Sequence, residues 1–256
     1  MTNYDKFNRE ERAICAHLFR LLHENLDSKE TNPLKQFIDK LSNQKISFKN
    51  YKSGLTDLRF ENLGIYCEVA IIRDAFQNKK PSINSFMDEL TQIIMKQESV
   101  EDCRLYSQLP EPLSNPRLTH PKQIRQKASA EGVHLSDNEA KVFGSMQGMF
   151  NAKPDLVITI DNKLLVFEAK FTESFDDLQL LRTENISEVW SKLLYRDFGF
   201  NEPPEYSVIK LGAGKFNPHI NWTDIYTIAE KTYDSTDRSR IAFKSGLDLL
   251  KDYKLE

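Results

Sequence analysis

Three charged side chains stand at the ends of two short apolar runs, and their types suit phosphate chemistry. Asp155 comes directly before the run 156–160, and Glu168 and Lys170 lie at the end of the run 164–171. Both runs are rich in leucine and β-branched residues and are separated by a short polar turn, which predicts a β-hairpin. The chemistry open to the three side chains depends on how the two strands pair.

The length of the hairpin loop decides which residues face each other. With 161–162 as a two-residue loop, Ile160 pairs with Lys163, and the same register places Asp155 opposite Glu168. Opposed residues share a face of the sheet, with Cβ atoms about 4.5–5.5 Å apart. Residues two apart on a strand also share a face, so the lysine that follows this glutamate joins the two carboxylates. A three-residue loop would shift the register by one and separate them.

Two carboxylates held this close repel each other unless a positive charge lies between them. Mg²⁺ prefers oxygen ligands and is typically bound by one or two protein carboxylates and several waters. Such an ion polarises a phosphate and lowers the pKa of a water, while a nearby lysine can orient that water or stabilise developing charge. Asp155, Glu168 and Lys170 therefore predict a Mg²⁺-dependent site for phosphodiester hydrolysis, in which Mn²⁺ can substitute.

The pairs of residues at the two strand ends resemble the signature of the PD-(D/E)xK nuclease superfamily, which includes many restriction endonucleases. Pro154-Asp155 matches its first part and Glu168-Ala169-Lys170 its second. The resemblance implies an α/β (α+β) fold with a mixed sheet flanked by helices. It also implies Asp155, Glu168 and the Ala169 carbonyl as metal ligands, and Lys170 as the catalytic lysine. The alternative is an ordinary hairpin with surface charges, but the run 164–167 is apolar on both faces, and charges at the end of a buried strand usually have partners.

The superfamily commonly places one more acidic residue on an earlier helix, and the resemblance makes Glu139 the candidate metal ligand. Glu139 also completes a capping box with Ser136, which explains it without catalysis. Glu131 is a weaker alternative. Downstream, Gln179 is a candidate to approach the site from the segment after the second strand.

The first hundred or so residues predict a helical module, because apolar residues recur at helical spacing. The expected helices begin after Asn8, at Pro33, near Leu58 and near Ser82, and the stretch Gly64–Ile72 within the third is equally compatible with a strand. Prolines at 110, 112, 116 and 121 then break regular structure. We place a domain boundary here, with residues 1–108 as the helical N-terminal module and 109–256 as the nuclease-like domain.

The second half continues after the hairpin with a predicted helix over 186–198, strands over 206–211 and 225–229, and a last helix over 236–253. Strands alternating with helices in this way are typical of α/β or α+β domains.

A basic stretch precedes the hairpin. Residues 113–130 contain Arg117, Lys122, Arg125 and Lys127 and no acidic residue. A short helix from position 121 would place Lys122 and Arg125 on one side, where they could contact phosphates, although a solvated helix face explains them equally well.

Two further groups have weaker links to function. Lys192, Tyr195 and Arg196 share a predicted helix and could touch a phosphate backbone, but their apolar neighbours indicate that this helix mainly packs. Trp222, near His219, could stack on a base, whereas anchoring of the following element in the core is favoured.

Composition bounds the remaining possibilities. The chain has 256 residues, 39% of them hydrophobic, and a formal net charge of −3, so no global positive field indicates a nucleic-acid partner. The three cysteines lie far apart, which favours neither a zinc site nor a disulfide framework. The polar N-terminus does not resemble a signal peptide, and no apolar run approaches the ~20 residues of a membrane span. We expect a cytoplasmic protein that does not associate with membranes.

These observations predict a metal-dependent nuclease acting on DNA rather than RNA, and an endonuclease rather than an exonuclease. A role in bacterial defence or restriction suits such an architecture by analogy. One alternative is a catalytically inactive nuclease fold that binds nucleic acid or a protein partner. Another is an interaction protein, or a self-associating one, that acts through its N-terminal helices.

Overall fold

A computed structural model describes residues 11–26, 32–49, 54–79 and 82–256, so the helix cap predicted at Asn8 lies outside the described residues. The fold is mixed α/β, built around an open sheet with the strand order β1-β2-β3-β4-β5. The strands are β1 (Gly64–Cys67), β2 (Leu156–Ile160), β3 (Lys163–Ala169), β4 (Glu205–Gly212) and β5 (Ile220–Asn221). The pairs β1–β2 and β2–β3 are antiparallel, and the pairs β3–β4 and β4–β5 are parallel.

The β2–β3 hairpin has the predicted two-residue loop and register, with Ile160 paired to Lys163. Asp161 in the loop adopts a positive φ of 50°, a conformation that aspartate tolerates better than most residues. Its carboxylate accepts backbone N–H bonds from Arg59 (2.8 Å) and Glu61 (2.7 Å), which tie the loop to the chain before β1. The register that aligns the site is therefore secured at the closed end of the hairpin.

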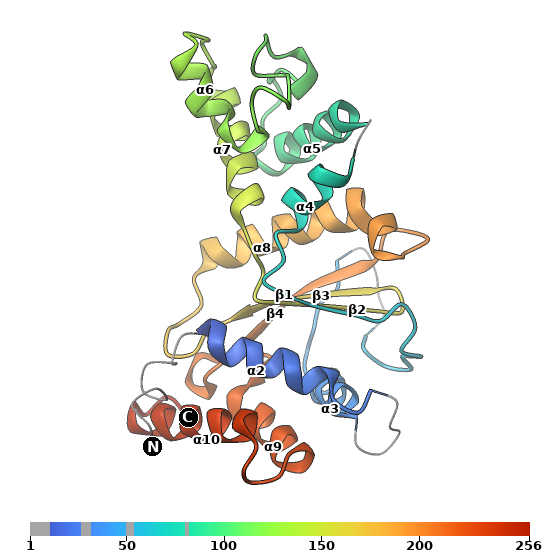
Figure 1. Ribbon diagram of the computed structural model, residues 1–256, viewed down its shortest axis with the longest axis vertical. Coiled ribbons are helices and arrows are strands. Elements are labelled where there is room, and N and C mark those ends of the chain that lie inside the picture. The colour runs from blue at the N-terminus through green and yellow to red at the C-terminus, as the bar shows by residue number, and fades with distance from the viewer. Residues whose placement is uncertain (1–10, 27–31, 50–53, 80–81) are drawn as a thin grey trace. The chain divides into compact units, whose positions relative to one another are not determined.

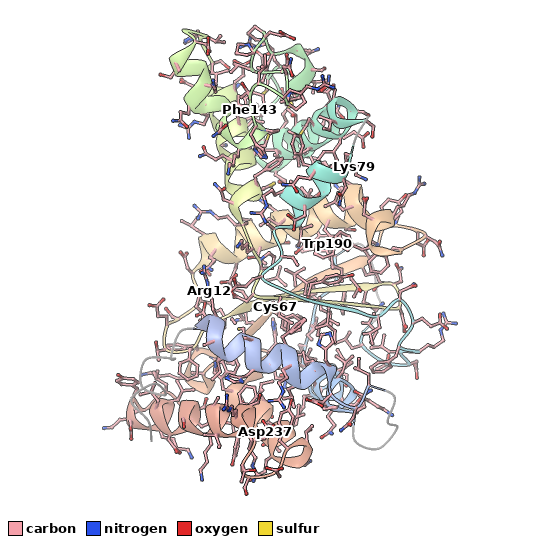
Figure 2. The ribbon with its side chains drawn as sticks, viewed as in Figure 1. Arg12, Cys67, Lys79, Phe143, Trp190 and Asp237 are labelled. Carbon is pink, nitrogen blue, oxygen red and sulfur yellow. The ribbon has the colours of Figure 1, made fainter. Side chains whose placement is uncertain are left out.

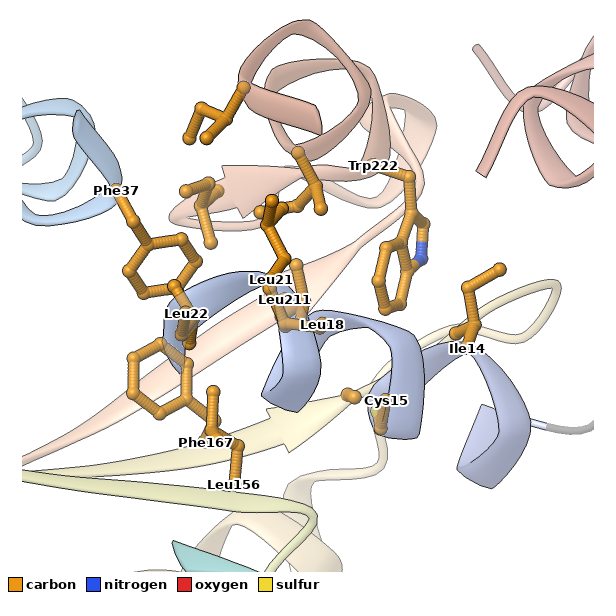
Figure 3. Packing of buried hydrophobic residues seen from close by; sticks show 14 of the residues in the cluster. Ile14, Cys15, Leu18, Leu21, Leu22, Phe37, Leu156, Phe167, Leu211 and Trp222 are labelled. Atoms are coloured by element: carbon orange, nitrogen blue, oxygen red, sulfur yellow. The ribbon is translucent and has the colours of Figure 1, made fainter. Parts of the chain in front are cut away.

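One face of the sheet is covered by four helices: α2 (Glu11–His23), α3 (Pro33–Ser42), α9 (Trp222–Thr232) and α10 (Arg238–Asp252) (Figure 1). Their apolar stripes and the inward side chains of β2, β3 and β4 form one hydrophobic core. Within it the rings of Phe37 and Phe167, both labelled in Figure 3, lie 5.6 Å apart. The rings of Phe171 and Trp222 lie 5.8 Å apart. The helices predicted after Asn8 and at Pro33 thus pack on the sheet.

Helix α8 (Asp177–Val189) lies on the opposite face of the sheet (Figure 1). Strand β3 is consequently buried along its whole length, as its doubly apolar run predicted. A charged side chain at the end of such a strand is enclosed by protein on both sides.

The chain divides into two compact units. The first comprises Met1–Glu68, Pro154–Ser187 and Pro203–Glu256, and the second Val69–Lys153 and Glu188–Glu202. The boundary predicted between residues 108 and 109 does not separate these units. The reason is that α2, α3 and β1 bury their apolar residues with the sheet and not in a separate helical module.

The second unit contains α4 (Ile71–Asn78), α5 (Ile83–Gln97), α6 (Ile124–Ala130) and α7 (Asp137–Asn151), and a π-helical turn, η3 (Trp190–Leu194), followed by a 3₁₀ turn, η4 (Tyr195–Phe198). Phe143 of α7, labelled in Figure 2, is buried in this unit. The ring of Phe76 packs edge-on against Phe150 (5.6 Å) and His120 (5.2 Å).

Three predicted elements differ from the observed ones. The expected helix over 58–76 is the strand β1 followed by α4, so the strand alternative at Gly64 was the better interpretation. The predicted strand 225–229 lies inside α9, which begins where the Asn221 side chain accepts the Asp224 N–H (2.8 Å). The helix predicted over 186–198 begins earlier, at Asp177, and ends in the π and 3₁₀ turns. No helix among the described residues is long and apolar enough to cross a membrane.

Candidate active site

The predicted site residues meet where β3 ends, within the first unit. Asp155 directly precedes β2, and its carboxylate accepts the backbone N–H of Ala169 at 2.8 Å. Glu168 and Lys170 share a face of the strand end, and the Lys170 ammonium lies 3.2 Å from the Glu168 carboxylate. Glu168 is only 4% exposed and Lys170 only 8%, so both charged groups are enclosed by protein.

A third carboxylate, Glu11 at the start of α2, completes the cluster and was not anticipated from the sequence. Its Oε1 lies 3.3 Å from the Lys170 Nζ. The acidic first turn of this helix was visible in the sequence, but it was sufficiently explained by the helix dipole, which favours acidic residues there. Lys170 therefore bridges two carboxylates, Glu11 and Glu168, that come from distant parts of the chain.

Helix α8 holds Glu168 from the other side. The Gln179 side-chain amide donates to Glu168 Oε1, and the Thr183 hydroxyl lies 3.1 Å from Oε2. The approach of Gln179 to the site was predicted, whereas Thr183 was not. Because Gln179 and Thr183 are four residues apart, they lie on one face of the helix and point at the same carboxylate.

The backbone of Lys170 is anchored on both sides. Its N–H donates to the Leu211 carbonyl of β4 (2.8 Å), and its carbonyl accepts the Trp222 indole N–H (2.9 Å). Trp222 is 2% exposed, so its favoured role as a core anchor is correct and stacking on a base is excluded. His219 exchanges two hydrogen bonds with the Lys210 backbone at 2.8 and 2.9 Å, and it supports β4 in the same way.

Burial and neighbouring charge set the protonation of these groups. Burial raises the pKa of Asp155, against the lowering effect of the Ala169 N–H bond. Burial and the charge of Asp155 together raise the pKa of Glu168. Burial alone would lower the pKa of Lys170, but Glu11 and Glu168 outweigh it and raise that pKa. The site therefore holds a charged ammonium among carboxylates whose negative charge is costly without further compensation.

Glu68 adds a second unanticipated acid near this end of the sheet. It follows β1, forms an ion pair with Arg12 at 3.3 Å, and its charge contributes to the raised pKa of Asp155. Figure 2 labels two residues of this region, Arg12 in α2 and Cys67 at the end of β1.

The cluster lies in the first unit, and the further predicted ligand is Glu139. It belongs to the second unit, where its carboxylate binds Arg104 and accepts the Ser136 N–H at 2.9 Å. The Arg104 guanidinium lowers the pKa of Glu139 to about 2. The capping box and Arg104 account for the contacts of Glu139, and its role as a metal ligand stays a prediction. The weaker candidate Glu131 is in the second unit also, 3.9 Å from Lys127.

The candidate phosphate contacts Lys192, Tyr195 and Arg196 lie in the second unit as well. Lys192 pairs with Glu188 at 2.5 Å, and the Arg196 guanidinium stacks 5.4 Å from the Tyr195 ring centre. Each of these contacts joins residues no more than four positions apart in the chain.

The chain matches no protein-family model, no curated protein and no solved structure. Any functional assignment therefore rests on the geometry and chemistry of the cluster itself.

The donor set at the strand end fits a hard divalent cation. Among the described residues, no group of three or more His, Cys, Asp and Glu side chains has the arrangement of a metal centre. Mg²⁺ needs fewer, since it is commonly held by two carboxylates and waters. Asp155 and Glu168 offer these carboxylates, and a cation would relieve the repulsion that raises the pKa of Glu168.

The Ala169 carbonyl, in a fully buried residue, points away from β4. Alternation along β3 turns the Ala169 N–H and C=O toward the β2 side, and counting on from the last observed pair, Leu156 and Phe167, puts Pro154 opposite Ala169. Proline has no N–H, so it cannot donate to the Ala169 carbonyl. The predicted carbonyl ligand therefore faces Asp155 and not the β4 ladder.

Proposed function

We propose that this chain is a metal-dependent nuclease that hydrolyses phosphodiester bonds at the cluster of Asp155, Glu168 and Lys170. The observation that carries the proposal is the contact of 3.2 Å between a buried carboxylate and a buried ammonium at the end of β3, beside a second carboxylate that precedes β2. Charged groups buried at one point are costly, and perturbed pKa values in such a cluster are typical of functional sites.

In this proposal Asp155 and Glu168 hold Mg²⁺, with Mn²⁺ as a substitute, and the Ala169 carbonyl is a third oxygen ligand. When bound, the ion would polarise the scissile phosphate and lower the pKa of the attacking water. Gln179 and Thr183 keep the Glu168 side chain in one orientation through its two oxygens. A fixed ligand loses little entropy when the cation binds.

Lys170 has the properties of a catalytic lysine. Its ammonium stays charged because two carboxylates raise its pKa, and its backbone is held by Leu211 and Trp222. A compact, pre-positioned donor can orient the attacking water or stabilise negative charge that develops on the phosphate. Glu11 is a positioning residue, since it acts on the reaction through the ammonium.

The expected substrate is nucleic acid, DNA rather than RNA, and the expected action is that of an endonuclease. A mixed sheet with helices on both faces agrees with the restriction-endonuclease-like fold that the motif implies, and supports this assignment by analogy. A role in bacterial defence or restriction remains part of the proposal.

The test is incubation of the purified full chain with plasmid, linear DNA and RNA, each with Mg²⁺, Mn²⁺ or EDTA. We expect cleavage with either metal and none with EDTA. Glu168→Gln should be inactive, whereas the matched control Glu101→Gln, at an exposed position of the second unit, should cut like the wild type. Equal cleavage by wild type and Glu168→Gln would overturn the proposal.

A second candidate is a nuclease fold that binds nucleic acid or a protein partner without cutting. The observation in its favour is that both oxygens of Glu168 already have protein partners, Gln179 and Thr183, in addition to Lys170. This candidate predicts that neither Mg²⁺ nor Mn²⁺ raises the melting temperature of the full chain, while the nuclease proposal predicts a rise that Glu168→Gln abolishes.

A further inference from the structure

The second unit contains an open cleft, and none of its described lining residues carries a carboxylate. It has a volume of about 1210 Å³ and lies between α4, the start of α5 and the proline-rich loop before η2 (Pro121–Gln123). Apolar atoms make up most of the exposed lining, and the polar lining residues include Gln77, Asn78, Asn84, Asn115 and Arg117. Amides and a guanidinium present many hydrogen-bond donors to one volume.

Arg117, which lines the cleft, belongs to a basic stretch of the chain. The stretch 113–130 holds four basic residues and no acidic one. Lys127 is paired with Glu131, but Arg117, Lys122 and Arg125 form no ion pair with any residue in the described ranges. Positive and negative side chains alternate on most charged surfaces. A segment with basic residues and no acidic ones therefore raises the local concentration of anionic ligands.

A contact between two rings connects the cleft wall to the segment that carries Lys122. The Phe76 ring, which lines the cleft, packs 5.2 Å from the His120 ring. The Lys122 N–H donates to His120 Nδ1 at 3.3 Å. Burial lowers the pKa of His120, and the charges of Lys122 and Arg73 lower it further. Arg73 is partly offset by Asp74 at 3.2 Å, whereas Lys122 is not paired within the described residues.

We propose that this cleft, with Arg117 in its lining and Lys122 near its wall, binds the phosphate backbone of a nucleic acid. Cations without partners suit phosphates, and asparagine and glutamine amides suit the hydrogen-bonding edges of bases. Leu118, 57% exposed beside Arg117, offers an apolar contact for a sugar or base face. The inference rests on the proposed function, because nucleic acid is the substrate there.

The experiment measures binding, not cutting. Fluorescence anisotropy of labelled single-stranded DNA, duplex DNA and RNA is recorded with the full chain in EDTA, over a range of salt concentrations. We expect the Arg117→Gln/Lys122→Gln variant to bind roughly tenfold or more weakly than the wild type at about 0.1 M salt. The slope of log affinity against log salt should become shallower by about 0.7–0.9 for each phosphate that the variant no longer neutralises.

The matched control is Lys244→Gln/Lys251→Gln, which removes two exposed charges from α10 in the first unit. It should keep the wild-type affinity and slope. Arg117→Gln alone, at an exposed position, is the second variant should the double variant melt at a lower temperature than the wild type.

The outcomes separate this inference from the proposed function. If both variants keep the wild-type affinity and salt slope while the wild type cleaves DNA, the proposed binding site in the cleft is wrong. The proposed nuclease activity would not be affected by that result. If the variants lose binding while the wild type cleaves nothing in Mg²⁺, nucleic-acid binding at the cleft is supported and the proposed nuclease activity is wrong. Equal competition by polyglutamate or by anionic lipid vesicles would show a non-selective anionic surface and overturn the nucleic-acid assignment.

Discussion

The carboxylate of Glu11 lies 3.3 Å from the ammonium of Lys170, although the two residues are 159 positions apart in the chain. This contact links α2 to the end of β3 and gives the lysine a second carboxylate besides Glu168. Because both carboxylates raise the pKa of Lys170, its positive charge persists in a site that is largely closed to solvent.

Glu11→Gln should weaken the site without unfolding the protein. The amide keeps the shape but removes a charge that holds the lysine, so we expect turnover to fall by roughly 10–100-fold, as for other residues that orient a catalytic group. The alkaline limb of the rate profile should also move to lower pH, since the pKa of Lys170 loses one of its two supporting charges. Glu24→Gln, just after the same helix, is the control; an unchanged pH profile in Glu11→Gln would show that Glu11 is only structural.

Asp155→Asn and Glu168→Gln should each abolish cleavage while leaving the fold intact. Burial raises the pKa of both carboxyl groups, so their negative charge at neutral pH costs stability when no cation is present. We therefore expect the melting temperature in EDTA to hold or rise in both variants, and the added stability from Mg²⁺ to disappear. Asp248→Asn, on the exposed side of α10, is the control. Wild-type cutting by Asp155→Asn would contradict the site assignment.

Lys170→Ala should reduce the turnover rate by something like the 10²–10³-fold typical of losing one stabilising donor. Affinity for nucleic acid should change little, because one ammonium is a small part of ground-state binding. Lys170→Arg should not restore the rate, since a planar guanidinium does not replace a compact ammonium between two carboxylates. Steady-state kinetics distinguish the cases: a normal maximal rate with a raised KM would make Lys170 a phosphate anchor.

Residues 109–256 alone should not fold. This fragment lacks α2 and α3, whose apolar residues cover the sheet, and β1, which pairs with β2. Removing β1 also leaves the edge of β2 open for pairing with other chains, so aggregation is expected. Circular dichroism and size-exclusion chromatography of the fragment check this; a monomeric, cooperatively melting fragment would show instead that the first 108 residues are a separable module.

Glu139→Gln should destabilise the second unit in a pH-dependent way. Arg104 lowers the pKa of Glu139 from an ordinary 4.5 to about 2. A lowered pKa stabilises the fold above the ordinary value, and this stabilisation is lost as pH falls from 4.5 toward 2. The melting temperatures of wild type and variant should therefore differ most near neutral pH and converge in that window. A constant difference from pH 7 to 3 would indicate that the arginine contact is not responsible.

Local signals in the sequence were enough to predict which residues lie at the centre of the candidate site. Two apolar runs around a two-residue loop predicted the register of β2 and β3, and with it the meeting of Asp155, Glu168 and Lys170. A strand has a period of two residues, so positions on one hairpin follow from counting. Gln179 was within reach because it lies soon after the same hairpin.

The partners from distant segments could not be found in this way. Glu11 reaches Lys170 only because α2 packs on the sheet, and its acidic helix start has an ordinary explanation in the helix dipole. Glu139 attracted attention for the opposite reason, since a strong local capping signal was also compatible with a ligand. The error at α9 is similar, because its β-branched isoleucines 225 and 228 suit a short strand as well as a helix.

The anchoring of Lys170 has a consequence for how the protein is made. A ribosome synthesises β2 and β3 well before Leu211 and Trp222, whose backbone carbonyl and indole secure the lysine. Until those residues have left the exit tunnel, the strand end has no parallel neighbour and the ammonium has no fixed position. Chains that stop before Trp222 therefore lack one of the two groups that anchor the lysine, so any chemistry of the site waits for this later segment.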